Sequence, residues 1–134
     1  MPTILVLGAT SDIGVATARK FAQHKYDVHL AARDPAKLNT LRSDLSIRFN
    51  IQCSIHPFDA TDFNSHKAFY KSLLPAPDVA VCVFGYMNEN EITINNPDET
   101  LKTINTNYTG AVSILNIIAS DYASRRQGTI VGIS

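Results

Sequence analysis

Two glycines near the start of the chain frame a turn whose composition suits the binding of a phosphate group. Gly8 and Gly14 enclose residues 8–14 (GATSDIG), which follow an apolar run and precede a helical one. At a strand-to-helix turn, glycine permits close approach of a pyrophosphate, and the N–H groups of the first helical turn face the phosphates. The alternative is a tight connection, capped by Ser11 or Asp12, that binds no ligand. We favour the binding site, and its predicted contacts are Gly8, Thr10, Ser11, Asp12, Ile13 and Gly14.

Arg33 stands at the end of the second apolar run and bears on the choice of nucleotide. An acidic residue at this point would accept a hydrogen bond from the ribose 2′-OH of NAD, whereas an arginine pairs with the 2′-phosphate of NADP. The alternative is a solvated arginine paired with Asp34. The sequence therefore predicts that the chain prefers NADP(H) to NAD(H).

The elements that must position these residues alternate between short β-branched runs and helical stretches. Strict alternation of this kind implies right-handed crossovers and a parallel sheet with helices on both faces. We expect an α/β fold of three layers: a doubly wound Rossmann domain over residues 1–134, with strand order 3-2-1-4-5, that stops after the fifth strand. The expected strands are 3–8, 27–32, 51–56, 78–84 and 128–133, and the expected helices are 12–25, about 35–45, 62–74 and about 97–124.

Local signals refine three of these helices. In the first helix, Ile13, Ala16 and Phe21 are expected to form the inner face. Asp34, followed by a proline at the first helical position, is expected to cap the second helix, and Asp62 is a candidate cap for the third.

Composition narrows the class of protein. The 134 residues are 45% hydrophobic and 18% charged, and twelve basic residues balance twelve acidic ones, so no net field attracts nucleic acid or an anionic membrane. We expect no membrane span, because no apolar stretch approaches the length of one. Cys53 and Cys82 are too few for a disulfide framework, and the four histidines do not cluster as zinc ligands. Buried free thiols in a cytoplasmic protein are the favoured interpretation.

The turn at residues 8–14 resembles the Thr-Gly-x-x-x-Gly-x-Gly motif of the short-chain dehydrogenase/reductase family, with Leu7 replacing the threonine and Asp12 replacing the middle glycine. A carboxylate near a pyrophosphate repels it, so Asp12 must face solvent or cap the helix. Arg33 matches the arginine of family members that prefer NADP.

Two further motifs carry the same resemblance. Asp59 and Ala60 resemble the family's Asp-Val pair, which implies that Asp59 meets the adenine amino group and Ala60 packs on the ring. The rival role for Asp59 is to cap the third helix. Gly85 is the one residue of the family's Asn-Asn-Ala-Gly motif that this chain keeps, and it implies close approach of the cofactor ribose to the backbone.

In the fourth helix, Asn107 and Gly110 resemble the family's Asn-x-x-Gly signature. The resemblance implies that Asn107 is a catalytic-site residue that holds a water linked to the catalytic lysine. Ser134 aligns with the first serine of the family's Ser-Ser pair, and the Tyr-x-x-x-Lys motif is expected beyond it. Tyr122 and Arg126 have similar spacing but lie at the end of the fourth helix, away from the expected catalytic region. The resemblance thus spans the chain and the first half of a typical member.

The family resemblance implies an NADPH-dependent oxidoreductase that transfers hydride to a small-molecule carbonyl or from an alcohol. The altered motifs are similar to those of divergent reductases of keto-sugars, which makes a keto-sugar one candidate substrate. The alternatives are a non-catalytic NADP(H)-binding sensor and a dimerising module. The resemblance also implies a homodimer or homotetramer that pairs through the fourth helix, and we expect the segment 1–134 alone to be inactive.

Overall fold

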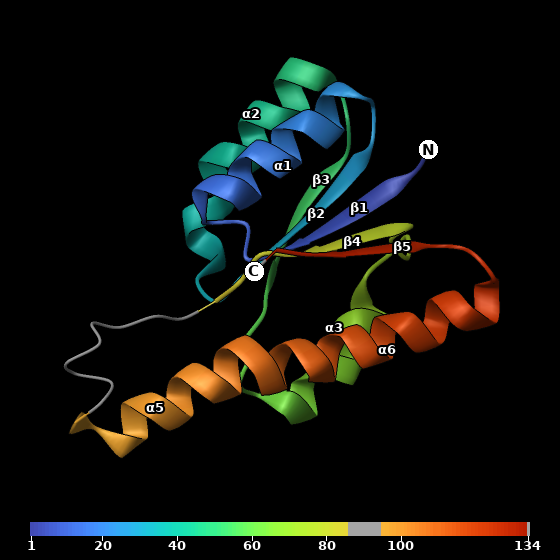
Figure 1. Ribbon diagram of the computed structural model, residues 1–134. Coiled ribbons are helices and arrows are strands. Elements are labelled where there is room, and N and C mark those ends of the chain that lie inside the picture. The colour runs from blue at the N-terminus through green and yellow to red at the C-terminus, as the bar shows by residue number, and fades with distance from the viewer. Residues whose placement is uncertain (86–94, 134) are drawn as a thin grey trace.

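A single five-stranded parallel sheet forms the centre of the molecule, with strand order β3-β2-β1-β4-β5, as predicted (Figure 1). The computed structural model describes residues 1–85 and 95–133; Ser134 and most of the polar loop expected before the fourth helix lie outside them. The strands are β1 (Thr3–Leu7), β2 (Asp27–Ala32), β3 (Cys53–Pro57), β4 (Val79–Cys82) and β5 (Thr129–Gly132).

β1 is the central strand, and all five of its residues are buried. Its register pairs Leu7 with Ala31 of β2 on one side and with Cys82 of β4 on the other. Because the strands are parallel, their carboxyl ends meet at one edge of the sheet. The segments that begin at Gly8, Arg33 and Val83 therefore leave the sheet side by side, which is where open α/β sheets bind ligands.

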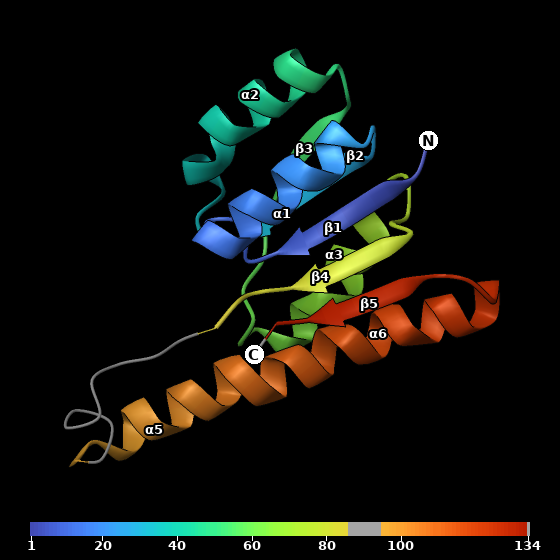
Figure 2. The same ribbon diagram turned by 45° about the horizontal axis from the view of Figure 1, so that its top comes forward.

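Helices cover both faces of the sheet, so the molecule has the three layers that the alternating pattern predicts (Figures 1 and 2). One apolar core lies beneath α1 and α2, and a second lies beneath α3 and α6. The helices are α1 (Asp12–Gln23), α2 (Asn39–Phe49), α3 (His66–Ser72), α5 (Pro97–Ile104) and α6 (Gly110–Arg125). None of the helices in the described residues combines the length and the apolar character that crossing a bilayer requires.

The inner face of α1 differs from the prediction. Gly14, Ala18 and Ala22 are the buried residues of this helix, whereas Ile13 is 53% exposed. The reason is the closeness of α1 to the turn beneath it: a Cβ on Gly14 would lie 2.5 Å from the carbonyl oxygen of Gly8. Small residues therefore face inward, and the larger Ile13 is left at the outer surface.

The predicted side-chain caps of the second and third helices were wrong. Asp34 and Asp62 make no capping hydrogen bond with their side chains. Each precedes a 3₁₀ turn, over Pro35–Leu38 and Phe63–Ser65 respectively. In such a turn the backbone carbonyl of the preceding aspartate accepts the i+3 amide, from Lys37 in one case and Ser65 in the other, at 3.3 and 3.0 Å.

The long fourth helix is confirmed, with an interruption that the pattern did not predict. Asn96 caps its start: the side-chain oxygen accepts from the amides of Asp98 and Glu99, at 3.0 and 3.4 Å. The helix runs through α5 and α6, but the segment Asn105–Thr109 between them is a π-helical turn. Turns of this kind occur often at functional sites, and this one contains Asn107.

Candidate functional site

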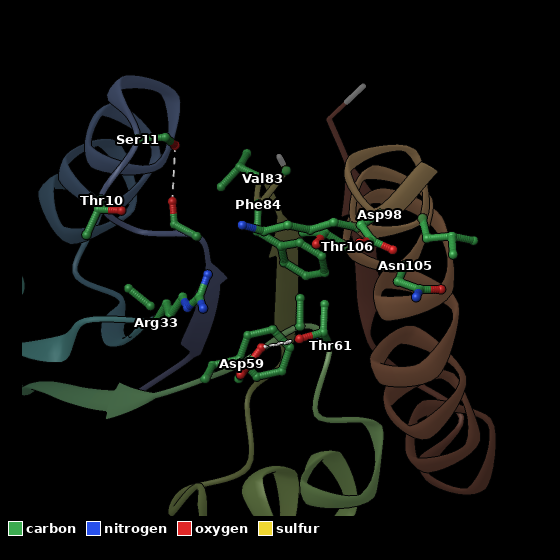
Figure 3. Close-up of a pocket in the computed structure, with 17 residues that line it drawn as sticks. Thr10, Ser11, Arg33, Asp59, Thr61, Val83, Phe84, Asp98, Asn105 and Thr106 are labelled. Carbon is green, nitrogen blue, oxygen red and sulfur yellow. Dashed lines mark hydrogen bonds between the residues drawn. The ribbon is translucent and has the colours of Figure 1, made fainter. Parts of the chain in front are cut away.

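A cleft of about 590 Å³ lies at the carboxyl edge of the sheet, between the ends of β1, β2 and β4 and the helix α5 (Figure 3). Residues from three predicted motifs meet there, although they are far apart in the sequence. The predicted site residues that line the cleft are Gly8, Thr10, Ser11, Arg33, Asp59, Ala60 and Gly85. Four others do not line it: Asp12, Ile13, Gly14 and Asn107.

The turn after β1 requires both of its glycines. Gly8 has a φ of +94°, a conformation that residues with a side chain rarely adopt, and a Cβ there would lie 2.6 Å from the amide nitrogen of Phe84. Gly14 lies directly over Gly8. The backbone of the first helical turn is thereby brought to the rim of the cleft.

Ser11, rather than Asp12, is the N-cap of α1. Its hydroxyl oxygen accepts from the Gly14 amide at 3.0 Å. Its hydroxyl donates to the Gly8 carbonyl at 3.1 Å, which closes the turn (Figure 3). Asp12 is exposed in the first turn of the helix and does not line the cleft. Of the two positions expected for its carboxylate, the structure therefore has the one that faces solvent.

Arg33 and Asp59 lie on the same side of the cleft, at the ends of neighbouring strands (Figure 3). The pKa of the Asp59 carboxyl is lowered, first by hydrogen bonds from Thr61 and further by the positive charge of Arg33. Within the described residues, Arg33 forms no ion pair with its neighbour Asp34. The exposed Arg33 therefore places its charge at the cleft instead of neutralising the adjacent loop acid.

A tight turn after β3 sets the shape of the Asp59 region. The Asp59 carboxylate accepts from the Thr61 amide at 3.0 Å and from the Thr61 hydroxyl at 2.8 Å, so it does not cap a helix. Gly110 of α6 packs closely against the other side of this segment. A Cβ on Gly110 would lie only 2.5 Å from the Ala60 carbonyl oxygen. The glycine of the Asn-x-x-Gly signature thus permits α6 to approach the turn.

Asn107 lies next to Gly85, the residue kept from the motif after β4. A Cβ on Gly85 would come within 3.3 Å of the Asn107 side-chain oxygen. Asn107 is exposed in this chain and belongs to the π-helical turn. The fold therefore brings two predicted site residues together at the margin of the cleft.

Sequence reasoning missed the contribution of helix α5. Its side chains form the wall opposite the glycine turn, where Asp98 can be seen in Figure 3, and Asn105, the first residue of the π-helical turn, continues this wall. The apolar repeat of this helix predicted only that it packs against the rest of the protein. No sequence motif indicates that a helix extends past the edge of the sheet and lines a cleft. The remaining lining residues are Ala32, Phe58, Thr61, Val83, Phe84, Leu101, Lys102 and Thr106.

Tyr122 is remote from the cleft, as the sequence indicated. It is buried near the carboxyl end of α6, and its ring lies against Gly128, just before β5. The hydroxyl of Tyr122 is buried and has no hydrogen-bond partner among the described residues. Burial raises its pKa to about 12, so this tyrosine is not prepared to exchange a proton.

The residues of the cleft fit a phosphate-bearing nucleotide. The turn at Gly8 leaves no room for a side chain, so only backbone faces a ligand there, and helix α1 begins directly behind it. Arg33 supplies a cation at the sheet edge, and Phe58 and Phe84 supply aromatic surface, with ring centroids 5.5 Å apart. Together these features define a Rossmann-type dinucleotide site.

Comparison with known proteins identifies the family. The family model for short chain dehydrogenase matches residues 2–134, so the chain belongs to the short-chain dehydrogenase family, whose fold binds NAD(P). An uncharacterized oxidoreductase of Streptomyces coelicolor is 34% identical over 98% of this chain and 53% of its own length. The human inactive hydroxysteroid dehydrogenase-like protein 1 is 26% identical over 97% of this chain and 41% of its own length.

Solved structures agree with this assignment. A metagenomic short-chain oxidoreductase, determined in complex with NADP, matches with a TM-score of 0.85 and 27% identity, over 99% of this chain and 61% of that one. The chain spans about half the length of the relatives it matches. The expected catalytic serine, tyrosine and lysine are not among the described residues of the cleft.

Proposed function

We propose that this chain is the NADP(H)-binding half of a short-chain oxidoreductase that transfers hydride between the cofactor and a carbonyl or alcohol carbon. The observation that carries the proposal is the position of Arg33. It follows β2 at the cleft, where the neighbouring Ala32 offers no acceptor for a ribose hydroxyl. Arg33 is therefore suited to a 2′-phosphate and not to a free 2′-OH.

Each predicted residue has a role in this proposal. The backbone of the turn between Gly8 and Gly14 holds the pyrophosphate, and Arg33 pairs with the 2′-phosphate. Asp59 and Ala60 face the adenine ring, and Gly85 leaves space for a ribose. When bound, the cofactor supplies the hydride. Asn107, beside Gly85, supports a proton relay at the margin of the site.

The substrate class is a small-molecule carbonyl or alcohol, and a keto-sugar remains our candidate. Cys53 and Cys82 are free thiols, in keeping with the proposed cytoplasmic location. We expect purified 1–134 to be inactive as a reductase, because no tyrosine is among the described residues that line the cleft. Oxidation of NADPH by this chain with any of a panel of carbonyl compounds would contradict that expectation.

A second candidate function is a non-catalytic NADP(H) sensor. The observation in its favour is the similarity to a relative named as an inactive hydroxysteroid dehydrogenase-like protein. The two asparagines of the family's Asn-Asn-Ala-Gly motif are replaced here by Cys82 and Val83, which agrees with it. An intact parent that binds NADPH but oxidises it with no carbonyl substrate would favour the sensor.

A thermal shift experiment tests the proposal on the chain itself. A ligand that binds only the native state stabilises it by about 2.7 kcal/mol at a hundredfold excess over Kd. We expect NADPH to raise the melting temperature of 1–134 more than NADH does at equal concentration. A larger shift with NADH would contradict the role of Arg33, and no shift with either nucleotide would contradict the proposed function.

A further inference from the structure

A buried histidine lies directly behind the adenine end of the proposed site. His66, the first residue of α3, is 0% exposed and does not line the cleft. Both nitrogens of its ring have partners. Nδ1 lies 2.7 Å from the Ser113 hydroxyl of α6, and Nε2 lies 2.9 Å from the backbone carbonyl oxygen of Asp59.

These partners fix the proton on the ring. The Asp59 carbonyl can only accept, so Nε2 of His66 carries the hydrogen and donates it. Nδ1 of the neutral ring is then an acceptor, and the Ser113 hydroxyl donates to it. A directed chain of two hydrogen bonds therefore runs from α6 through His66 to the backbone of the Asp59 turn.

The His66 ring also packs against the residue that precedes Asp59. It stacks on Phe58 with a centroid separation of 4.9 Å and an interplanar angle of 25°. Both Phe58 and Asp59 line the cleft. One buried ring thus contacts two consecutive residues of the cleft wall from behind, through stacking and through a hydrogen bond.

Among the described residues, the Asp59 turn is otherwise held by hydrogen bonds within it, including one from the Asp62 amide to the same Asp59 carbonyl oxygen at 3.2 Å, and by one close approach. Its carboxylate is bonded to Thr61, two residues further on. Gly110 packs against the carbonyl of Ala60, but a glycine has no side chain that could donate a hydrogen bond to it. His66 supplies the long-range polar contact that sets the orientation of the peptide group between Asp59 and Ala60.

We propose that His66 is a positioning residue for cofactor binding: its Nε2–H fixes the Asp59–Ala60 peptide, and the Ser113 hydroxyl, bonded to Nδ1, holds the ring in the orientation that makes this possible. The inference rests on the proposed NADP(H) site, and it concerns the adenine half alone. His66 does not touch the ligand. Its loss weakens binding by loosening the segment that presents Asp59 and Ala60.

A matched pair of substitutions tests this role. His66→Gln places an amide nitrogen near the position of Nε2 and keeps the donor. His66→Asn places its amide near Nδ1 and leaves the Asp59 carbonyl with only the local donor, the Asp62 amide at 3.2 Å. The probe is 2′,5′-ADP, titrated by calorimetry into purified 1–134. We expect His66→Asn to weaken binding about tenfold and His66→Gln to stay within about threefold of the unaltered chain.

Ile118→Val is the control for a loss of stability alone. Ile118 is 0% exposed in the core beneath α6 and does not line the cleft. We expect this variant to melt at a lower temperature, because a buried methyl group is lost, and to bind 2′,5′-ADP as the unaltered chain does. Ser113→Ala, which removes the hydrogen bond to Nδ1, is expected to fall between the two His66 variants.

The outcomes separate this inference from the proposed function. Equal affinities of His66→Asn and the unaltered chain would overturn the inference, and so would equal losses in His66→Asn and His66→Gln. Failure of the unaltered chain to bind 2′,5′-ADP would instead overturn the proposed function. Amide hydrogen exchange tests the positioning without any ligand: His66→Asn should speed exchange at Thr61 more than His66→Gln does, and unchanged exchange in both would also refute it.

Discussion

The backbone of Gly8 lies against the backbone of Phe84, so that a Cβ on Gly8 would come within 2.6 Å of the Phe84 nitrogen. The turn after β1 and the segment that follows β4 therefore pack directly against each other at the cleft. We predict that Gly8→Ala lowers the free energy of unfolding by about 2 kcal/mol, through its positive φ and this contact, and removes NADPH binding. Urea denaturation and a fluorescence titration with NADPH measure the two effects.

Gly132→Ala is the matched control for this substitution. Gly132 lies in β5, and a Cβ there would meet nothing within 4 Å. We expect this variant to change the free energy of unfolding by less than about 0.5 kcal/mol and to bind NADPH normally. Similar losses in the two variants would show that the turn has no special requirement for glycine.

Removal of the hydroxyl group is expected to affect stability differently at Tyr70 and at Tyr122. The Tyr70 hydroxyl donates to the Asp121 carboxylate at 2.6 Å, whereas the buried Tyr122 hydroxyl has no partner among the described residues. Tyr70→Phe should cost about 1–2 kcal/mol, because Asp121 loses a donor, and Tyr122→Phe should be neutral or stabilising. Thermal unfolding of both variants checks this. A larger loss in Tyr122→Phe than in Tyr70→Phe would contradict the hydrogen-bond assignment.

Two histidines outside the cleft predict how stability depends on pH. His29 Nδ1 lies 3.0 Å from His56 Nε2, and burial lowers the pKa of both side chains below the ordinary value of 6.5. The unfolded chain therefore binds more protons than the folded chain once the pH falls below that value. The free energy of unfolding should decrease as the pH falls from about 6.5 and be insensitive to these groups above about 7.5.

Urea unfolding at a series of pH values tests the direction of this dependence. His56→Gln removes one of the two groups and should make the decline shallower. The lowered pKa values of Asp44 and Asp59 act in a more acidic range, near their ordinary value of 3.8 and below it. A free energy of unfolding that rises as the pH falls through 6.5 would contradict the burial of the histidine pair.

The outer side of the long helix predicts self-association. Ile104, Tyr108 and Val112 are 49%, 70% and 43% exposed and follow one another at helical spacing. Apolar side chains grouped in this way indicate a surface that another protein covers, and we propose that a second copy does so. Light scattering should detect dimers of 1–134, and Tyr108→Glu should shift them to monomers. A chain that remains monomeric at all concentrations would contradict the proposed homo-oligomer.

Periodicity and glycine placement were sufficient to predict the sheet. The apolar runs at 3–8 and 27–32 correspond to β1 and β2. Strict alternation with helices predicted the parallel sheet, and the Rossmann strand order chosen for it is confirmed. The inner face of α1 was predicted correctly at Phe21, which packs against the core, and wrongly at Ile13 and Ala16, which are exposed. Helical spacing alone does not say how closely the helix approaches the sheet. That distance decides whether Ile13 or Gly14 is buried.

The site was predictable where motifs follow strands and unpredictable where it depends on distant packing. Arg33 and Asp59 follow β2 and β3, so the parallel sheet brings them together. The wall formed by α5 depends on how far that helix extends past the sheet edge. His66 acquires its position from Ser113, 47 residues away, and nothing near it in the sequence indicates that partner.

The preference for NADPH is the central claim, and Arg33→Asp tests it most directly. Titrations of the unaltered chain with NADPH and NADH should give a Kd for NADPH at least about tenfold lower, equivalent to about 1.4 kcal/mol. Arg33→Asp should reverse the ratio, because a carboxylate repels the 2′-phosphate and accepts from the 2′-OH, and Arg33→Lys should keep the preference for NADPH in weaker form. Equal affinity for both nucleotides in the unaltered chain, or an unchanged ratio in Arg33→Asp, would contradict the account.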